Sequence, residues 1–297
     1  MKRTASFSQS ALIACLLADV AWLLSACSKA SEYYEDETDK AIRSQAVIVT
    51  DENGNESTLT EGSTIGVYVM GEDGGISLHK VEVDEDGNAI LPTFTQEETI
   101  IAYTPFQDEW GVDALTSNPI FTVKSDQSTQ EQYDASDLMI ASLNPADAKD
   151  GNGLRFRHVL AKVAIHVIDE TGRLELNQIN VKLHTIKNSV WVDLLHQTVT
   201  TIPEQCSDIL MLSKITTDWR ISSYAIVAPQ KIADGTTFLT VMLFGVNYTY
   251  PIPQASTLEA GKTYTINIRL TLNGLIPDGW SITDWDDEGE GNIDIEV

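Results

Sequence analysis

The stretch LAKVAIHVID, from Leu160 to Asp169, decides the fold class. Its apolar positions are Val163, Ile165 and Val167, and they alternate with Lys162, Ala164 and His166. A period of two residues is typical of a β-strand, in which successive side chains point to opposite faces. The stretch therefore predicts a strand with one buried face and one solvated face.

The same alternation recurs along the chain from about Gln45, interrupted by turn residues. No segment has the apolar spacing of an amphipathic helix of ten or more residues, so we predict an all-β protein. The Asp-Gly step in Asp84–Asn88 indicates a hairpin between its two flanking strands. The other predicted strands lie at 46–50, 63–70, 76–83, 89–94, 98–106, 176–183, 222–230, 236–246, 248–253 and 262–272.

The polar segment Leu143 to Gly153, with its proline and glycines, is the best candidate for a linker. It divides the chain into halves of similar length, and each half has enough strands for a β-sandwich. We therefore predict two tandem β-sandwich domains, at residues 45–150 and 151–297.

The first 27 residues have the layout of an export signal, with Lys2 and Arg3 before an apolar run from Ala11 to Leu24. That run is too short to span a bilayer as a helix. The sequence Leu24-Ser25-Ala26-Cys27 is similar to a lipobox, so we expect acylation of Cys27 and a lipid anchor in the outer membrane. An ordinary cleaved secretory signal is the alternative.

The three cysteines agree with this interpretation, because Cys15 lies in the signal and Cys206 is the only other one. No intramolecular disulfide can form if Cys27 is acylated, and we expect Cys206 to be a small buried apolar residue. Residues 28–44 are predicted to be an acidic tether. Its run from Glu32 to Glu37 is either a signal for the outer face of the outer membrane or a solvated stretch.

The composition argues against nucleic acid as a partner, because 44 acidic and 19 basic residues give a net charge of −25. No zinc, phosphate-loop, dinucleotide or serine-hydrolase motif occurs, and the five histidines are scattered. We predict no catalytic residue, no metal site and no cofactor. A glycosidase would need two facing carboxylates, and the sequence selects no such pair.

Two local patterns carry weaker expectations. Asp286, Glu288 and Glu290 have the alternate spacing that begins a calcium loop, but the pattern fails at Val297, so an acidic turn is expected instead. Trp280 and Trp285 could together form an exposed platform for sugar rings, although tryptophans are usually core residues.

Several segments together resemble the fimbrillin family of type V pilins. They are Ile100–Phe106, Ser136–Ala141, Leu154–Val167, Val227–Gln230, Leu258–Leu270 and Ser281–Asp287, in the order in which the family has them. The resemblance implies two transthyretin-like β-sandwich domains and partnership with other pilus subunits by donor-strand exchange. In that family an arginine-specific protease cuts after an early strand, and a neighbour's strand fills the groove that opens.

Arg43 is the candidate for this proteolytic maturation, yet the predicted strand at 46–50 follows it. Either the cut at Arg43 retains that strand, or this subunit is not processed in this way. The candidate donor strand comprises Asn292, Ile293, Asp294, Ile295, Glu296 and Val297, which is otherwise the last strand of its own sandwich.

The sequence thus predicts a non-enzymatic, surface-exposed lipoprotein that is a pilus subunit, or a tip or anchor adhesin with a receptor that is a glycan or a protein. The alternative is a surface glycan-binding β-sandwich lipoprotein. A carbohydrate hydrolase comes third.

Overall fold

The computed structural model describes residues 42–49, 56–95, 98–143, 153–170, 179–216, 220–251 and 256–285. These residues form sheets almost throughout, which confirms the predicted all-β class. The described helices are short, namely α1 (Ala114–Ser117) and α2 (Gln130–Asp134). Among the described residues, no helix has the length and hydropathy needed to span a bilayer.

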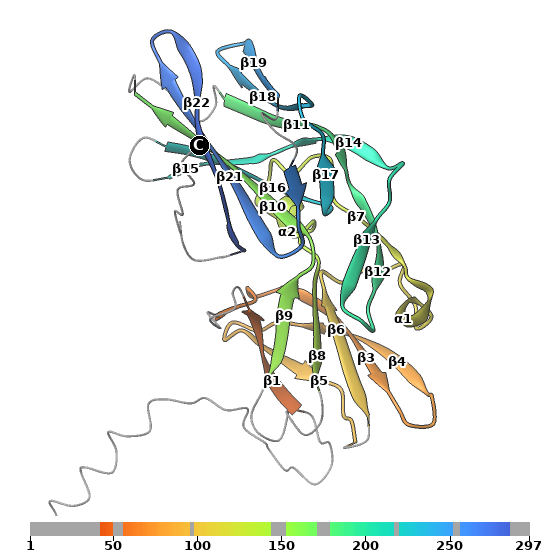
Figure 1. The fold of residues 1–297 in the computed structure, drawn as a ribbon. Coiled ribbons are helices and arrows are strands. Elements are labelled where there is room, and N and C mark those ends of the chain that lie inside the picture. The colour runs from red at the N-terminus through yellow and green to blue at the C-terminus, as the bar shows by residue number, and fades with distance from the viewer. Residues whose placement is uncertain are drawn as a thin grey trace, which may run out of the picture.

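The first lobe is an eight-stranded sheet, at the bottom of the molecule in Figure 1. Its strand order is β2-β1-β9-β8-β6-β3-β4, and β5 also pairs with β1. The strands are β1 (Ile42–Val49), β2 (Glu56–Thr58), β3 (Thr64–Met70), β4 (Ile76–Glu82), β5 (Asn88–Leu91), β6 (Thr99–Thr104), β8 (Met139–Leu143) and β9 (Leu154–His158).

The second lobe holds four smaller sheets, with the orders β15-β16-β10-β21-β22, β14-β11-β18-β19, β13-β12-β7 and β17-β20. Their strands are β7 (Ile120–Thr122), β10 (Ala161–Asp169), β11 (Ile179–Lys187), β12 (Ser189–Asp193), β13 (Thr198–Thr201), β14 (Cys206–Leu210), β15 (Leu212–Thr216), β16 (Arg220–Val227), β17 (Gln230–Ile232), β18 (Thr237–Leu243), β19 (Val246–Pro251), β20 (Ser256–Leu258), β21 (Lys262–Thr271) and β22 (Gly274–Asp284). Packed sheets of this kind place the protein among the β-sandwiches.

The stretch that predicts the fold becomes β10, which lies between antiparallel β16 and parallel β21. Val163, Ile165 and Val167 are fully buried, as expected. The prediction of a solvated opposite face was wrong, because Ala164 and His166 are 2% and 7% exposed. His166 can be buried in a central strand because its Nδ1 lies 2.6 Å from the hydroxyl of Ser222 across the ladder.

The predicted turn at Asp84–Asn88 is present, but the strands beside it separate. The backbone N–H of Asp84 donates to the carbonyl of Asn88 at 2.8 Å, and Gly87 has the positive φ, 77°, that this turn requires. Beyond one bridge between Val83 and Ala89, however, β4 pairs with β3 and β5 pairs with β1. The turn therefore connects β4, at one edge of the sheet, to β5, which pairs with β1 near the opposite edge.

Each face of the first sheet is buried against a different core. One face contributes residues such as Val67, Ala102 and Phe156 to a core made of residues 46–156. The other contributes Tyr68, Tyr103 and others to a second core that continues through the second lobe as far as Trp285. Apolar packing is thus continuous between the lobes.

The segment between β6 and β8, residues 105–138, leaves the first sheet and packs on the second lobe. Its strand β7 pairs with β12. The side chain of Gln127 is fully buried, donates to the carbonyl of Ile226 at 2.8 Å and accepts from the N–H of the same residue at 2.8 Å. The chain between two strands of the first sheet is therefore held in the second lobe by backbone pairing and by side-chain hydrogen bonds.

The predicted domain boundary between residues 150 and 151 falls between two strands that are neighbours in one sheet. β8 and β9 pair antiparallel on either side of it, and β9 also pairs with β1. Residues 144–152 lie outside the described residues. The chain passes from the first sheet to the second lobe later, between His158 and Ala161.

Candidate functional site

The candidate cleavage residue, Arg43, lies inside β1 and not before it. The first half of β1 pairs antiparallel with β5, where Arg43 is opposite Ile90. The second half pairs with β9 and β2. The backbone of Arg43 is therefore part of a sheet, whereas a protease needs an extended segment that it can reach.

A cut after Arg43 would leave most of β1 in place. The N–H of Leu154 donates to the Ser44 hydroxyl at 3.1 Å, and the N–H of Ala46 donates to the carbonyl of Gly87 at 3.1 Å. Ala46 and Val47 are buried. The next lysine or arginine after Arg43 is Lys80, in β4. A protease that cuts after basic residues therefore has no site directly after β1, where a cut would separate β1 from the next strand.

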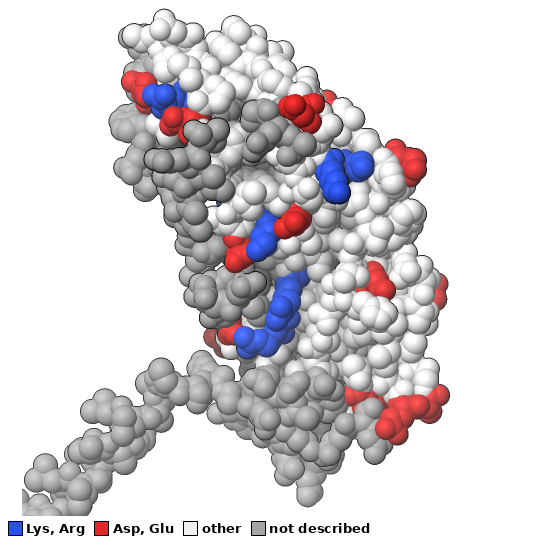
Figure 2. Space-filling model, viewed as in Figure 1, with Lys and Arg blue, Asp and Glu red and all other residues white. Residues whose placement is uncertain are grey.

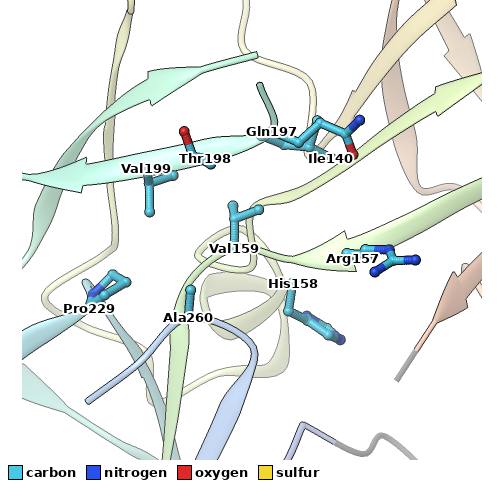
Figure 3. A pocket seen from close by; sticks show the side chains of 9 residues that line it. All are labelled: Ile140, Arg157, His158, Val159, Gln197, Thr198, Val199, Pro229 and Ala260. Carbon is cyan, nitrogen blue, oxygen red and sulfur yellow. The ribbon is translucent and has the colours of Figure 1, made fainter. Parts of the chain in front are cut away.

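A shallow hollow lies where the two lobes meet, with a volume of about 320 Å³ (Figure 3). Small apolar side chains such as Val159 and Val199 line it, and the exposed Arg157 lies at its side. Its described lining residues are Ile140, Arg157, His158, Val159, Gln197, Thr198, Val199, Pro229 and Ala260. None of them is a carboxylate, so this hollow lacks the facing pair of acids that a glycosidase uses.

The junction beside this hollow is closed by aromatic stacking. The ring of His158 lies parallel to the indole of Trp285, with centroids 3.9 Å apart, and its Nδ1 lies 2.9 Å from Asp137 Oδ1. The N–H of Trp285 donates to the carbonyl of Gly261, and the N–H of Gly261 donates to the carbonyl of Leu160. These contacts fix the end of β22 against the start of β10.

The predicted sugar platform of Trp280 and Trp285 was wrong. Trp285 is 1% exposed, and Trp280 packs on the core beside Phe238, with ring centroids 6.3 Å apart. Trp280 lies in β22 and is half-buried, whereas Trp285 follows that strand and is buried, so the two rings do not form an exposed platform. Among the tryptophans that the structure describes, Trp191 is the exposed one, at 42%.

Trp191 was missed by the sequence reasoning, although a signal was present. It stands between Val190 and Val192, which are both buried, so the period of two residues places it on the opposite, outward face of β12. Trp110 is a core residue, and Trp219 lies outside the described residues.

The expectation that Cys206 is buried was also wrong, because it is exposed and free at the start of β14. The histidines pair separately with neighbouring polar groups, for example His196 Nδ1 with Asp193 Oδ2 at 2.8 Å. Within the described part of the chain, no three His, Cys, Asp or Glu side chains are grouped as a metal site would require.

Several predicted residues lie outside the described residues. They are Cys27 with the signal at 1–27, nearly all of the tether at 28–44, the acidic turn at Asp286–Glu290, and the candidate donor strand Asn292–Val297. The roles predicted for these residues remain predictions.

Surface charge follows the acidic composition (Figure 2). On the face that it shows, Lys and Arg lie in several small, separate groups, and some of these groups lie beside Asp or Glu. Arg269, for example, lies 3.2 Å from Glu170 and from Asp278. This face lacks the basic stripe that binds a phosphate backbone.

The architecture defines the class of the protein, which is a β-sandwich protein. The family model described as fimbrillin-like matches residues 49–285. The chain therefore belongs to the fimbrillin-like family. No curated protein sequence matches it.

Solved structures share this fold. A candidate cell adhesion protein from Bacteroides ovatus has a TM-score of 0.62 at 16% identity, over 82% of this chain and 97% of its own. A second such protein, from Bacteroides uniformis, has a TM-score of 0.57 at 18% identity, over 82% and 98%. The tip fimbrial protein Mfa3 from Porphyromonas gingivalis, with a C-terminal truncation, has a TM-score of 0.50 at 10% identity, over 82% and 98%.

Proposed function

We propose that this chain is a non-enzymatic fimbrial subunit that acts in cell adhesion at the bacterial surface, as a tip or anchor subunit and not as the repeating unit of the stalk. The match to the fimbrillin-like family over residues 49–285 is the observation that carries the proposal. Solved structures that share its fold include candidate cell adhesion proteins and a tip fimbrial protein, which supports the proposal.

The place of Arg43 favours the tip or anchor role over the stalk. A stalk subunit must both donate a strand and accept one, which requires a groove that is empty after maturation. Here β1 is held by pairing with three strands, and cleavage after Arg43 would leave Ser44 to Val49 in the sheet. A subunit that retains its own strand has no empty groove for a neighbour's strand, so the fibre ends at that subunit.

Assembly would use the candidate donor strand Asn292–Val297, whose Ile293, Ile295 and Val297 alternate with polar residues. An inserted strand satisfies unpaired backbone groups in a neighbour and buries its apolar side chains there. Cys27 would carry the acyl chains that hold the protein in the outer membrane, with residues 28–44 as the tether. The two β-sandwich domains would divide near Val159, later than the sequence suggests.

The experiment that tests this proposal follows the tagged full chain in cells that produce the corresponding fimbriae. The protein is expected in the outer-membrane fraction and in sheared fimbriae, and deletion of residues 292–297 is expected to remove it from fimbriae but not from the membrane. Cys27→Ala should abolish labelling with a palmitate analogue. Absence of the wild-type chain from both fractions would refute the proposal.

A further inference from the structure

The outward face of the three-stranded sheet β13-β12-β7 presents an exposed aromatic ring on a flat support. Trp191 is central in this sheet and 42% exposed. Ile120 lies directly opposite on β7 and is 48% exposed, and Thr200 lies opposite on β13. Figure 1 shows these strands at the side of the molecule, next to the region where the lobes meet.

The support under this ring is rigid. The inward side chains Phe121, Val190 and Val192 are buried in the core that joins the lobes. At one end of the face, the hydroxyls of Thr122 and Ser189 are 2.8 Å apart across the ladder. A ring held on a packed sheet loses little conformational entropy when a ligand binds.

Polar groups suited to hydroxyl ligands surround the ring. Thr198 and Thr200 are exposed, and Thr198 is opposite Asp193 in the ladder. Asp193 Oδ1 accepts the backbone N–H of His196 at 3.0 Å, and its other oxygen lies 2.8 Å from His196 Nδ1. These hydrogen bonds, that from the backbone of His196 first, lower the pKa of Asp193, so the carboxylate is ionised at neutral pH and accepts hydrogen bonds.

We propose that the Trp191 face, defined by Ile120, Thr122, Trp191, Asp193, Thr198 and Thr200, binds a neutral glycan, with a pyranose ring against the indole and its hydroxyls bonded to Thr200 and Asp193. The C–H face of a pyranose is apolar and flat, and an indole offers the matching surface. Threonine hydroxyls donate and accept, while a carboxylate accepts, which together match the hydroxyls at the ring edge.

Charge selects the ligand class. The Trp191 face has one carboxylate and no Lys or Arg among its six positions, in a chain with a net charge of −25. Anionic glycans and anionic lipid headgroups are therefore repelled. A protein partner is less favoured because stable interfaces bury an apolar core, and only Ile120 and Trp191 contribute exposed apolar side chains at these six positions.

This inference deepens the proposed role in adhesion, since it names the class of receptor. Its failure is distinguishable from failure of the proposed function, because sugar binding and incorporation into fimbriae are measured separately. A chain that enters fimbriae without binding sugar would retain the proposed function and lose this inference.

Isothermal titration of the full chain in detergent tests the site, with maltohexaose, cellohexaose, mannohexaose and chitohexaose as neutral probes and heparin as the acidic comparison. Binding of at least one neutral probe, and none of heparin, is expected. Trp191→Ala should weaken that binding by about tenfold or more, and Trp191→Phe by less, because a smaller aromatic ring remains. Thr200→Val, which removes the hydroxyl at nearly constant volume, should weaken it about threefold or more.

Leu272→Ala is the matched control, because Leu272 is an apolar residue, 85% exposed, in the turn between β21 and β22. It should bind the probes as the wild type does, and thermal unfolding should show that every variant is folded. Failure of all four neutral probes to bind overturns the proposal, and so does equal binding by folded Trp191→Ala. Loss of fimbrial incorporation in Trp191→Ala with unchanged sugar binding would assign the face to a protein partner instead.

Discussion

The imidazole of His158 and the indole of Trp285 stack with centroids 3.9 Å apart and an interplanar angle of 5°. His158 ends β9 in the first sheet, whereas Trp285 follows β22, the last strand of the second lobe. The contact therefore joins the two lobes across 127 residues of sequence (285 − 158). It lies immediately before Asp286, where the segment with the candidate donor strand begins.

Trp285→Ala is expected to destabilise the protein by about 3–5 kcal/mol, because it removes a fully buried ring and leaves a cavity in the shared core. Trp191→Ala is the matched control and should cost under about 1 kcal/mol, since that ring is 42% exposed. Urea unfolding followed by far-UV circular dichroism measures both. Equal losses of unfolding free energy would contradict the role given to Trp285.

Gln127→Leu is expected to cost about 2–4 kcal/mol, although leucine is close to glutamine in size. The change leaves the N–H and the carbonyl of Ile226 without the side chain that now bonds both of them. Gln130→Leu, at an exposed position of α2, is the control and should change the unfolding free energy by about 0.5 kcal/mol or less. If Gln127→Leu is as stable as the control, Gln127 does not join residues 105–138 to the second lobe.

The strands and the contacts between them differ in how well the sequence predicts them. Period-two patterns gave the strands β3, β6, β10 and β21 at nearly their observed places, because those strands pack an apolar face on a core. The pairing of β7 with β12 was not predictable in this way. β7 has three residues, and its position depends on contacts such as that of Gln127 with Ile226, between residues 99 positions apart.

The candidate sites divide in the same manner. Alternation could have placed Trp191 on the outside, since it depends on the immediate neighbours Val190 and Val192. The partner of Trp285 could not be predicted, because the ring stacks on His158 in another sheet. The predicted domain boundary falls between two paired strands, β8 and β9, for a related reason. The polar segment of sequence between β8 and β9 has the composition of a linker between domains.

Gly66→Ala is expected to destabilise the first lobe by about 1–3 kcal/mol, because an added methyl group would overlap the ring of Tyr103. That ring is fully buried, and its centroid lies 4.8 Å from that of Trp110, so it has no space to move. In the control Gly111→Ala, the nearest atom is a carboxylate oxygen of the exposed Asp113, which can rotate away. Thermal unfolding should show a lower midpoint for Gly66→Ala alone, and an unchanged midpoint would contradict this packing.

The carboxylate of Asp208 is expected to stabilise the folded state at neutral pH and to lose this effect in acid. The backbone N–H of Thr185 donates to its carboxylate at 3.1 Å and, with the nearby His184, lowers its pKa below the ordinary value of 3.8. Since the folded state holds the proton less tightly than the unfolded state, the contribution is complete above pH 3.8 and declines as the pH falls through the folded-state pKa.

Asp208→Asn should therefore lower the unfolding free energy at pH 7 by no more than about 1 kcal/mol, because the carboxylate is partly exposed. The difference from the wild type should shrink as the pH falls below 3.8. Urea titrations at several pH values measure it. A difference that grows toward acid pH would mean that the carboxylate is not stabilised in the folded state.

Release of β1 requires a cut that follows it, and the chain lacks a basic residue there. Thr50→Arg supplies one directly after Val49, the last residue of β1. After treatment with an arginine-specific protease, this variant should hold β1 only by its pairing with β2, β5 and β9, so that a strand of another copy can replace it. Oligomers that resist SDS are expected from this variant and not from the treated wild type, whose cut at Arg43 leaves β1 joined to the chain.

Thr50→Lys is the control, because it has the same charge, is not cut by the protease and should stay monomeric. Oligomers from the treated wild type would show that β1 need not leave its sheet for subunits to join, and the tip or anchor role would lose its structural support.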